Sequence, residues 1–334
     1  MSDEPQIAMS GEDRLIARYF RPLARAPGAF GLTDDVAVLE PPPGWDVVLK
    51  TDPIISGVHF FPDDPADAIA RKALRVNLSD LAAKGATPAG FLLALALPPQ
   101  TSEHWLAQFA QALGEDADRY ECPLLGGDTD ATPGLLTVSI TAFGLVPHGT
   151  MVPRNGAKVG DQVVVSGTIG DAALGLRLRR AAPGSPAPAA FLRAHLLARY
   201  QIPEPRTALA QTLRHYASAA MDISDGLAGD LAKLCHASGV SAQINTAELP
   251  LSEAARSMLD ADPGLLEPVL TGGDDYEILC TVPSAQLADF RVAAAATGIP
   301  VAVIGQVVAG SEDPRFTDAR GRPRSFPRPS FSHF

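Results

Sequence analysis

Basic residues and long apolar runs are both scarce in this 334-residue chain. Lys and Arg number 27 against 38 Asp and Glu, which gives a net charge of −11. Such an acidic balance argues against broad affinity for nucleic acid or for an anionic membrane surface. The longest apolar run, near Phe91–Leu97, is far shorter than a membrane span, and Met1–Glu12 lacks the pattern of a signal peptide. We therefore expect a cytoplasmic protein with neither a nucleic-acid nor a membrane partner.

Cysteine is also rare. The three cysteines, Cys122, Cys235 and Cys280, lie far apart, their number is odd, and no CxxC pair occurs. This pattern excludes a disulfide framework and a zinc knuckle, and it fits a reducing compartment.

Several well-known catalytic motifs are missing as well. The sequence has no GxxxxGK[ST] loop, no GxGxxG unit with its acidic partner, no HExxH and no GxSxG. P-loop, Rossmann, zincin and serine-hydrolase interpretations therefore lose their main support. Gly167–Gly175 has the glycines of a phosphate loop but no lysine, and we interpret it as a turn from a strand into a helix.

The chain is long enough for two domains, which we expect at residues 1–150 and 151–334. The mixed order of helical and extended patterns predicts an α+β (mixed α/β) fold, with an α/β second domain. Patterning predicts helices at 11–20, 65–84, 104–120, 171–180, 191–200, 206–217 and within 221–237. It predicts strands at 36–39, 47–49, 91–97, 135–144, 159–166, 242–244, 278–282 and 301–304.

Aspartates recur in six short segments next to Gly, Ser or Thr. These segments are Thr33–Asp35, Thr51–Asp52, Asn77–Asp80, Gly126–Asp130, Asp222–Gly226 and Gly272–Asp275. Any one of them alone is most simply a turn, because Asp and Gly favour turns. Six together favour Mg²⁺ and phosphate binding, since Mg²⁺ takes carboxylates and glycines let backbone N–H groups approach phosphate.

Asp80 is the most informative of these residues. In a helix starting at Pro65 it shares one face with Ile69, Ala73 and Val76, and that face should pack inward. A carboxylate there needs a metal, hydrogen bonds or a basic partner. The alternatives to metal binding are a cap of the helix end or a pair with Arg71 or Arg75.

Other positions have both a structural and a functional interpretation. Asp222 and Asp225 flank Ser224 at the start of a helix, whose N-terminus favours anionic groups. Ser224 or Asp225 could cap this helix, and the two aspartates could hold a metal. Asp128 follows a glycine pair where a strand is expected to leave for a loop. His59 is a core histidine or a site residue, and Lys50 pairs with an aspartate or contacts phosphate.

Together the segments resemble the thiamine-monophosphate kinases, in the superfamily of aminoimidazole ribonucleotide synthetase. The matching stretches are Gly11–Phe20, Thr33–Ala37, Thr51–Phe60, Asn77–Ala86, Gly126–Thr129, Arg154–Asp161, Asp222–Leu227, Gly273–Glu277 and Ser332–Phe334. The resemblance implies a two-domain fold and a homodimer whose N-terminal sheets pair across a two-fold axis. It also implies transfer of the γ-phosphoryl group of ATP to thiamine monophosphate, which yields thiamine diphosphate and ADP.

The same resemblance implies roles for particular residues. It assigns Mg²⁺ to Asp35, Thr51, Asp52, Asp80, Asp128, Asp222 and Asp225, with Lys50 beside them where the family often has Ser or Thr. It assigns ATP to Gly127, Asp128, Arg154 and Ser224, and thiamine monophosphate to His59, Asp274 and Phe331. The chain departs from the family pattern at Asp274, usually Glu, and at Phe331, usually Tyr or Trp.

The acceptor phosphate is itself a nucleophile, so we expect direct transfer assisted by Mg²⁺, without a general base or a phospho-enzyme. Two alternatives remain open at this stage. One is another ATP-dependent enzyme of the superfamily, such as an aminoimidazole ribonucleotide synthetase. The other is a non-catalytic protein that binds MgATP.

Overall fold

The computed structural model describes residues 11–182, 188–326 and 330. The chain divides into two compact units. Unit 1 comprises residues 1–43, 49–77 and 88–144, and unit 2 comprises residues 44–48, 78–87 and 145–334. Each unit is described separately below.

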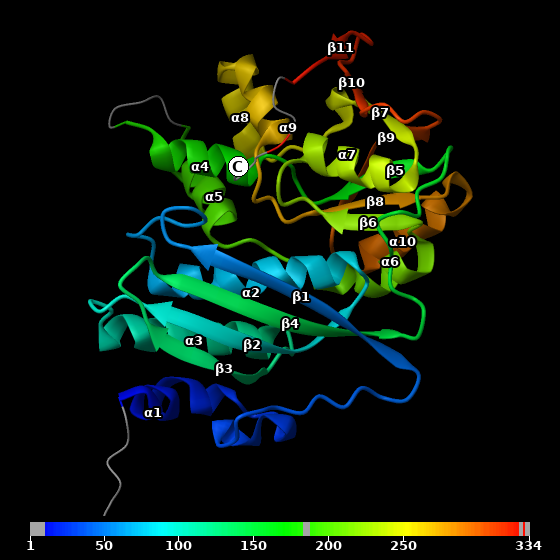
Figure 1. Cartoon of the computed structure of the whole chain (residues 1–334). Helices are drawn as coiled ribbons and strands as arrows, with labels where there is room; N and C mark the ends of the chain where they lie inside the picture. The colour runs from blue at the N-terminus through cyan, green and yellow to red at the C-terminus, as the bar shows by residue number, and fades with distance from the viewer. Residues whose placement is uncertain (1–10, 183–187, 327–329, 331–334) are drawn as a thin grey trace, which may run out of the picture. The chain divides into compact units, whose positions relative to one another are not determined.

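Unit 1 is built on a four-stranded sheet in the order β1-β4-β2-β3 (Figure 1). The strands are β1 (Trp45–Ile55), β2 (Thr87–Leu97), β3 (Leu124–Ala131) and β4 (Thr137–Pro147). The helices are α1 (Gly11–Leu15), which runs on as a π-helical turn at Ile16–Phe20, α2 (Ala66–Ala83) and α3 (Glu103–Arg119), with short 3₁₀ turns at Arg21–Leu23 and Pro27–Leu32. The predicted helices at 65–84 and 104–120 are confirmed.

Local chemistry explains where these helices lie. The Ser102 side chain accepts a hydrogen bond from the Trp105 backbone N–H at 3.1 Å and so caps the start of α3. The face of α2 predicted to be buried is buried, since Ile69, Ala73 and Val76 are at most 2% exposed.

Two expectations for unit 1 were wrong. Residues 36–39 form no strand, and Val38 instead donates one backbone hydrogen bond to the Gly28 carbonyl at 2.9 Å. Asp128 lies inside the parallel strand β3, opposite Ala94 of β2, rather than in a loop after a strand. Glycine explains the second error, because a Cβ at Gly127 would lie 1.8 Å from the Leu93 carbonyl oxygen. Two strands can approach so closely only where that position has no side chain.

Unit 2 is an α/β unit around a mixed seven-stranded sheet in the order β11-β10-β7-β9-β5-β8-β6. Its strands are β5 (Gln162–Ser166), β6 (Ala219–Asp222), β7 (Ser241–Asn245), β8 (Ile278–Val282), β9 (Val301–Val308), β10 (Arg315–Thr317) and β11 (Pro323–Arg324). Its helices are α4 (Asp171–Arg180), α5 (Ala190–Gln201), α6 (Ala210–Tyr216), α7 (Leu227–Ser238), α8 (Glu253–Ala261), α9 (Leu266–Thr271) and α10 (Leu287–Ala296), with short 3₁₀ turns at Thr207–Leu209, Thr246–Glu248, Pro263–Leu265 and Ser284–Gln286.

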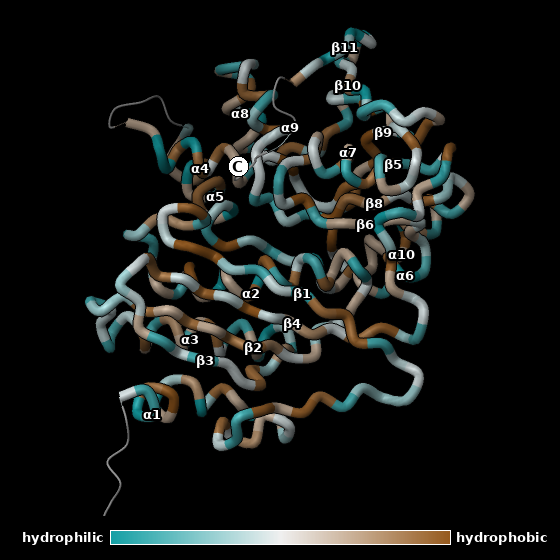
Figure 2. Tube along the Cα trace, in the orientation of Figure 1, coloured by the Kyte–Doolittle hydropathy of each residue, from teal (hydrophilic) through white to brown (hydrophobic). Residues whose placement is uncertain are grey.

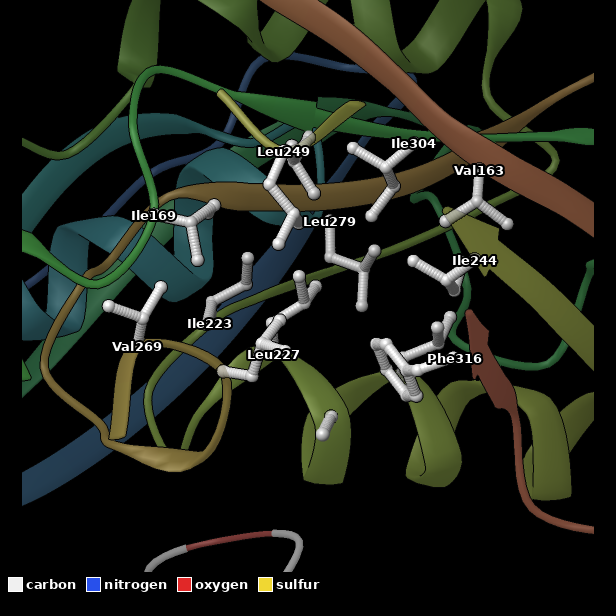
Figure 3. Packing of buried hydrophobic residues seen from close by; sticks show 14 of the residues in the cluster. Val163, Ile169, Ile223, Leu227, Ile244, Leu249, Val269, Leu279, Ile304 and Phe316 are labelled. Carbon is white, nitrogen blue, oxygen red and sulfur yellow. The ribbon is translucent and has the colours of Figure 1, made fainter. Parts of the chain in front are cut away.

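Helices cover both faces of this sheet. Alternating residues of β5 separate two cores: Val163 packs in the core that holds Leu227 of α7, and Val164 packs in the core that holds Phe290 of α10. Figure 3 shows the first core, where Leu279 of β8 lies among residues from α7, β7 and β9. The hydropathy along α7 alternates between hydrophobic and hydrophilic residues, as expected for a helix with one buried face (Figure 2). The mixed α+β fold with an α/β second unit is therefore confirmed.

The sequence patterning missed α8, α9, α10 and the two short strands β10 and β11 of this unit. The turn interpretation of Gly167–Gly175 is confirmed, because β5 ends at Ser166 and α4 begins at Asp171. Among the described residues, no helix is both long enough and apolar enough to cross a membrane.

Candidate active site

Unit 1 contains a cavity of about 630 Å³ that joins an apolar wall to an acidic, glycine-rich wall. Ile16, Phe20 and Leu32 contribute to the apolar wall. The polar wall holds Asp34, Asp35, Gly126, Gly127, Asp128 and Thr129. Three residues predicted to bind metal or ATP, namely Asp35, Gly127 and Asp128, therefore line one cavity.

Two of the three aspartates that line this cavity are predicted metal ligands, and both are open to a ligand. Asp35 and Asp128 are both exposed. One carboxylate oxygen of Asp128 accepts the backbone N–H of Thr129 at 2.9 Å, which fixes the direction of the side chain. A carboxylate oriented in this way is an oxygen ligand suited to Mg²⁺, and the glycine pair beside it lets phosphate approach the backbone.

The Lys50–Asp52 segment lies on β1. Lys50 forms an ion pair with Asp52 at 3.0 Å, as one interpretation of the sequence anticipated. The Thr51 hydroxyl donates to the Ile140 carbonyl oxygen at 3.2 Å and accepts from the Thr141 hydroxyl at 3.0 Å. These contacts orient Thr51 from the neighbouring strand β4.

His59 is half-buried in unit 1, at the end of the segment that follows β1. Its Nδ1 accepts the Ile55 backbone N–H at 3.0 Å, and its carbonyl oxygen accepts from Lys72 Nζ at 2.9 Å. An accepting Nδ1 places the proton of a neutral imidazole on Nε2. The ring is thus held in one orientation and keeps Nε2–H as its donor.

Asp80 lies near the end of α2, in the part of that helix that belongs to unit 2, and it is half-buried. The basic residues weighed as its partners, Arg71 and Arg75, both form ion pairs with Asp116 of α3, at 2.7 and 2.6 Å. The metal-binding interpretation of Asp80 stays a prediction.

In unit 2, Asp222 ends β6 and is buried, whereas Ser224 and Asp225 are half-buried in the turn before α7. Asp230 of α7 accepts the backbone N–H groups of Ser224 and Asp225 at 3.0 and 2.9 Å. Lys233 forms ion pairs with Asp225 and Asp230. The turn is therefore fixed by a helix that begins only two residues after it.

Burial raises the pKa of Asp230, although its bond to Lys233 acts in the opposite direction. For Lys233, burial lowers the pKa, but hydrogen bonds to Asp225 and Asp230 outweigh it and the net shift is upward. Lys233 thus stays protonated and neutralises the carboxylates beside the turn. The sequence analysis missed both Asp230 and Lys233, although their spacing on one helix face was visible.

The Gly273–Glu277 segment pairs with this turn through backbone hydrogen bonds. Ile223 donates to the Glu277 carbonyl at 2.8 Å, Tyr276 donates to the Ile223 carbonyl at 2.8 Å, and Asp274 donates to the Ser224 carbonyl at 2.9 Å. These bonds extend the antiparallel pairing of β6 and β8 beyond both strands. Asp274, the predicted substrate residue, therefore lies beside Ser224, the predicted ATP residue.

Two predicted residues, Arg154 and Phe331, remain. Arg154 is exposed, and its carbonyl oxygen accepts from the Ser238 hydroxyl at 3.2 Å. Phe331 lies outside the described residues. Within either unit, the described residues contain no group of three or more His, Cys, Asp or Glu side chains arranged around a metal position. Mg²⁺ does not need such a group, because it is often held by one or two carboxylates together with waters and substrate phosphates.

Comparison with known proteins places both units in one class. Residues 33–146 match the family "AIR synthase related protein, N-terminal domain", and residues 158–315 match "AIR synthase related protein, C-terminal domain". The fold and the acidic, glycine-rich segments therefore define a two-domain protein of the AIR synthase related class.

Closer relatives narrow this class. The chain is 45% identical to thiamine-monophosphate kinase of Caulobacter vibrioides over 92% of this chain and 86% of that protein. The crystal structure of thiamine-monophosphate kinase from Stenotrophomonas maltophilia K279a superposes with a TM-score of 0.81 at 38% identity, covering 93% of this chain and 96% of that one. A structure of AaThiL complexed with AMPPCP and TMP has a TM-score of 0.75 at 30% identity, covering 92% and 97%. The chain belongs to the thiamine-monophosphate kinase family, a family of phosphotransferase enzymes.

Proposed function

We propose that this protein phosphorylates thiamine monophosphate with ATP, giving thiamine diphosphate and ADP. The observation that carries the proposal is the 45% identity to a thiamine-monophosphate kinase across 92% of the chain. The complex of AaThiL with AMPPCP and TMP supports the same pair of ligands. The cavity lined by Asp35, Gly127 and Asp128 adds the acidic and glycine-rich surface that a metal-bound triphosphate needs.

The donor set of the chain fits Mg²⁺, since exposed carboxylates of Asp35 and Asp128 line one cavity. We propose that the ions are held by Asp35, Thr51, Asp52, Asp80, Asp128, Asp222 and Asp225, with Lys50 balancing the charge of Asp52. When bound, Mg²⁺ supplies positive charge that offsets the repulsion between the two phosphorylated substrates.

The chain's own residues act by binding and orienting. We propose that Gly127, Arg154 and Ser224 contact ATP. The guanidinium of Arg154 suits phosphate, because it can donate two parallel hydrogen bonds to one phosphate group. His59, Asp274 and Phe331 contact thiamine monophosphate. No residue has to remove a proton, because the phosphate of thiamine monophosphate is already an anionic nucleophile, and transfer to it is direct and in line.

We further propose a cytoplasmic homodimer with domains at 1–150 and 151–334. Alternate residues of β1 are exposed, and among them Val47 and Leu49 are apolar, at 37% and 66% exposed. An apolar sheet face of this kind supports pairing of the N-terminal sheets of two protomers. The buried free thiols of Cys122, Cys235 and Cys280 fit a reducing compartment.

The test is an assay of purified protein with ATP and thiamine monophosphate, with and without Mg²⁺. We expect thiamine diphosphate and ADP in equal amounts, only with the metal. Release of ADP with formylglycinamidine ribonucleotide but not with thiamine monophosphate would instead indicate a synthetase of the same class. Tight MgATP binding without any product would indicate a non-catalytic protein. Phosphate carried from γ-labelled ATP onto the protein during turnover would contradict direct transfer.

A further inference from the structure

The Gly273–Glu277 segment alternates between buried and accessible side chains. Asp275 and Glu277 are 1% and 0% exposed, whereas Asp274 and Tyr276 are half-buried. Asp274 and Tyr276 also have left-handed backbones, with φ of 73° and 49°. Residues other than glycine adopt this conformation at a cost, and they keep it only where their surroundings impose it. The two buried side chains, Asp275 and Glu277, can hold the segment in this conformation through the contacts they make.

Glu277 is held by groups from three separate parts of unit 2. Its carboxylate accepts from the Ser166 hydroxyl at the end of β5 at 2.6 Å and from Arg199 of α5 at 2.9 Å. Arg206, which follows α5, donates from Nε at 2.7 Å and makes a second, shorter bond from Nη2. A Cβ at Gly167 would lie 2.1 Å from the same carboxylate, so Glu277 packs directly against the backbone there. The two-pronged bond from Arg206 fixes both oxygens of the carboxylate.

Asp275 fixes the other buried point of the segment. Its carboxylate accepts the Gly170 backbone N–H at 2.7 Å and the Ala172 backbone N–H at 3.3 Å, at the start of α4. Arg199 also donates to the Asp275 carbonyl oxygen at 3.1 Å. Arg199 thus donates hydrogen bonds to both Asp275 and Glu277, whereas Arg206 donates its two parallel bonds to the Glu277 carboxylate.

We propose that Arg206 and Glu277 are positioning residues for thiamine monophosphate, which hold Asp274 where it meets the substrate. This inference rests on the proposed function. Arg199 alone can neutralise Glu277, so loss of Arg206 leaves no uncompensated buried carboxylate, but it removes the fork that sets the orientation of Glu277. Ser224 on the ATP side accepts the Asp274 backbone N–H, but its own backbone N–H is held by Asp230 of α7, so the effect should fall mainly on the thiamine side.

The experiment measures KM for each substrate and kcat in Arg206→Met and Arg206→Lys. In Arg206→Met we expect KM for thiamine monophosphate to rise about 10-fold, while kcat and KM for ATP change less than about threefold. Arg206→Lys should lie between this variant and the unaltered enzyme, because lysine supplies the charge but not the fork. Arg322→Met is the matched control, since it removes an exposed arginine ion pair with Asp318 in the same unit.

A double variant separates positioning from a general loss of structure. If Arg206 acts through Asp274, Arg206→Met adds no further rise in KM once Asp274 is already alanine. Circular dichroism and a melting curve show whether each variant is folded.

The possible results are distinct. An unchanged KM in folded Arg206→Met, an equal effect on both substrates, or full additivity with Asp274→Ala would each overturn the positioning role and leave the proposed function intact. No turnover of thiamine monophosphate by the unaltered enzyme would overturn the proposed function itself, and with it this role.

Discussion

Asp274 combines an unfavourable backbone conformation with a predicted role in binding. With φ of 73° it lies where glycine is favoured by about 1 kcal/mol or more. We therefore expect Asp274→Gly to stabilise the protein by less than about 1 kcal/mol, because the greater flexibility of glycine in the unfolded chain offsets part of the gain. The KM for thiamine monophosphate should rise in the same variant. Thermal unfolding and steady-state kinetics measure the two effects, and a stabilised enzyme with unchanged KM would show that Asp274 does not contact substrate.

Asp128 offers a matched comparison within one strand. Asp128 and Asp130 are both exposed, and each accepts the backbone N–H of the residue that follows it, at 2.9 and 2.8 Å. Only Asp128 of the two lines the unit 1 cavity. Asp128→Asn should lower kcat by about 100-fold or more and raise the Mg²⁺ concentration needed for half-maximal rate, because the amide keeps the shape but loses the charge. Asp130→Asn should keep near-normal kinetics, and equal losses in both variants would count against the cavity as the metal site.

At the scale of elements, α2 and α3 are joined by a buried ion pair whose strength can be measured. Asp116 is 0% exposed and accepts from Arg71 and from Arg75, which is itself 2% exposed. Asp116→Asn removes the buried carboxylate that both arginines bond and should cost about 3–5 kcal/mol. Glu115→Gln is the control, because Glu115 bonds Arg71 from an exposed position, and its loss should cost less than about 1 kcal/mol. Urea unfolding measures the free energy of unfolding of each variant. Similar losses in both variants would refute the prediction that the buried pair at Asp116 contributes more than the exposed pair at Glu115.

Element prediction from sequence succeeded for α2 and α4 but missed α8 (Glu253–Ala261), although α8 has a clear apolar face. α2 and α4 were found within one or two residues, because a long apolar face or a glycine turn marks them. The missed helix α10 (Leu287–Ala296) is rich in alanine and has no sharp division into faces. The segment 36–39 alternates like a strand, yet Val36 and Val38 are 65% and 46% exposed in an irregular stretch.

The candidate site was predictable as segments but not as contacts. The composition of the acidic, glycine-rich stretches located Asp35, Gly127 and Asp128, which do line one cavity. The hydrogen bond between Arg206 and Glu277 joins residues 71 positions apart, and no local sequence pattern predicts a contact between residues so far apart. Such pairs depend on the tertiary path of the chain, which a single sequence does not reveal.

For the whole molecule, the exposed apolar face of β1 makes the oligomeric state a test of the proposed dimer. Leu49 is 66% exposed, and a lysine there would place a charge on the surface we propose to be buried between protomers. Leu49→Lys should shift the protein from dimer to monomer in analytical ultracentrifugation, while the circular dichroism spectrum stays the same. Val292→Lys is the control, because Val292 is 73% exposed on α10 of unit 2. A dimer that survives Leu49→Lys would show that this face is not the interface.

The three cysteines report on both units of the molecule at once. Cys122 belongs to unit 1, Cys235 and Cys280 to unit 2, and all three are free and buried. Burial raises the pKa of each thiol to about 12. At pH 8 the native thiolate fraction is therefore on the order of 10⁻⁴, and a thiol reagent should label none of them while activity persists.

Because the folded pKa exceeds the unfolded value, the native state holds its thiol protons more tightly. Stability should thus be unaffected by these groups below about pH 9 and decline as the pH rises from there towards 12.

Pulsed alkylation across a urea series, followed by mass spectrometry, identifies which cysteine becomes reactive first. If the two units open separately, Cys122 labels at a different urea concentration from Cys235 and Cys280, whereas a single shared midpoint would show that the units unfold as one cooperative body. Rapid labelling of any of the three without urea would contradict their burial.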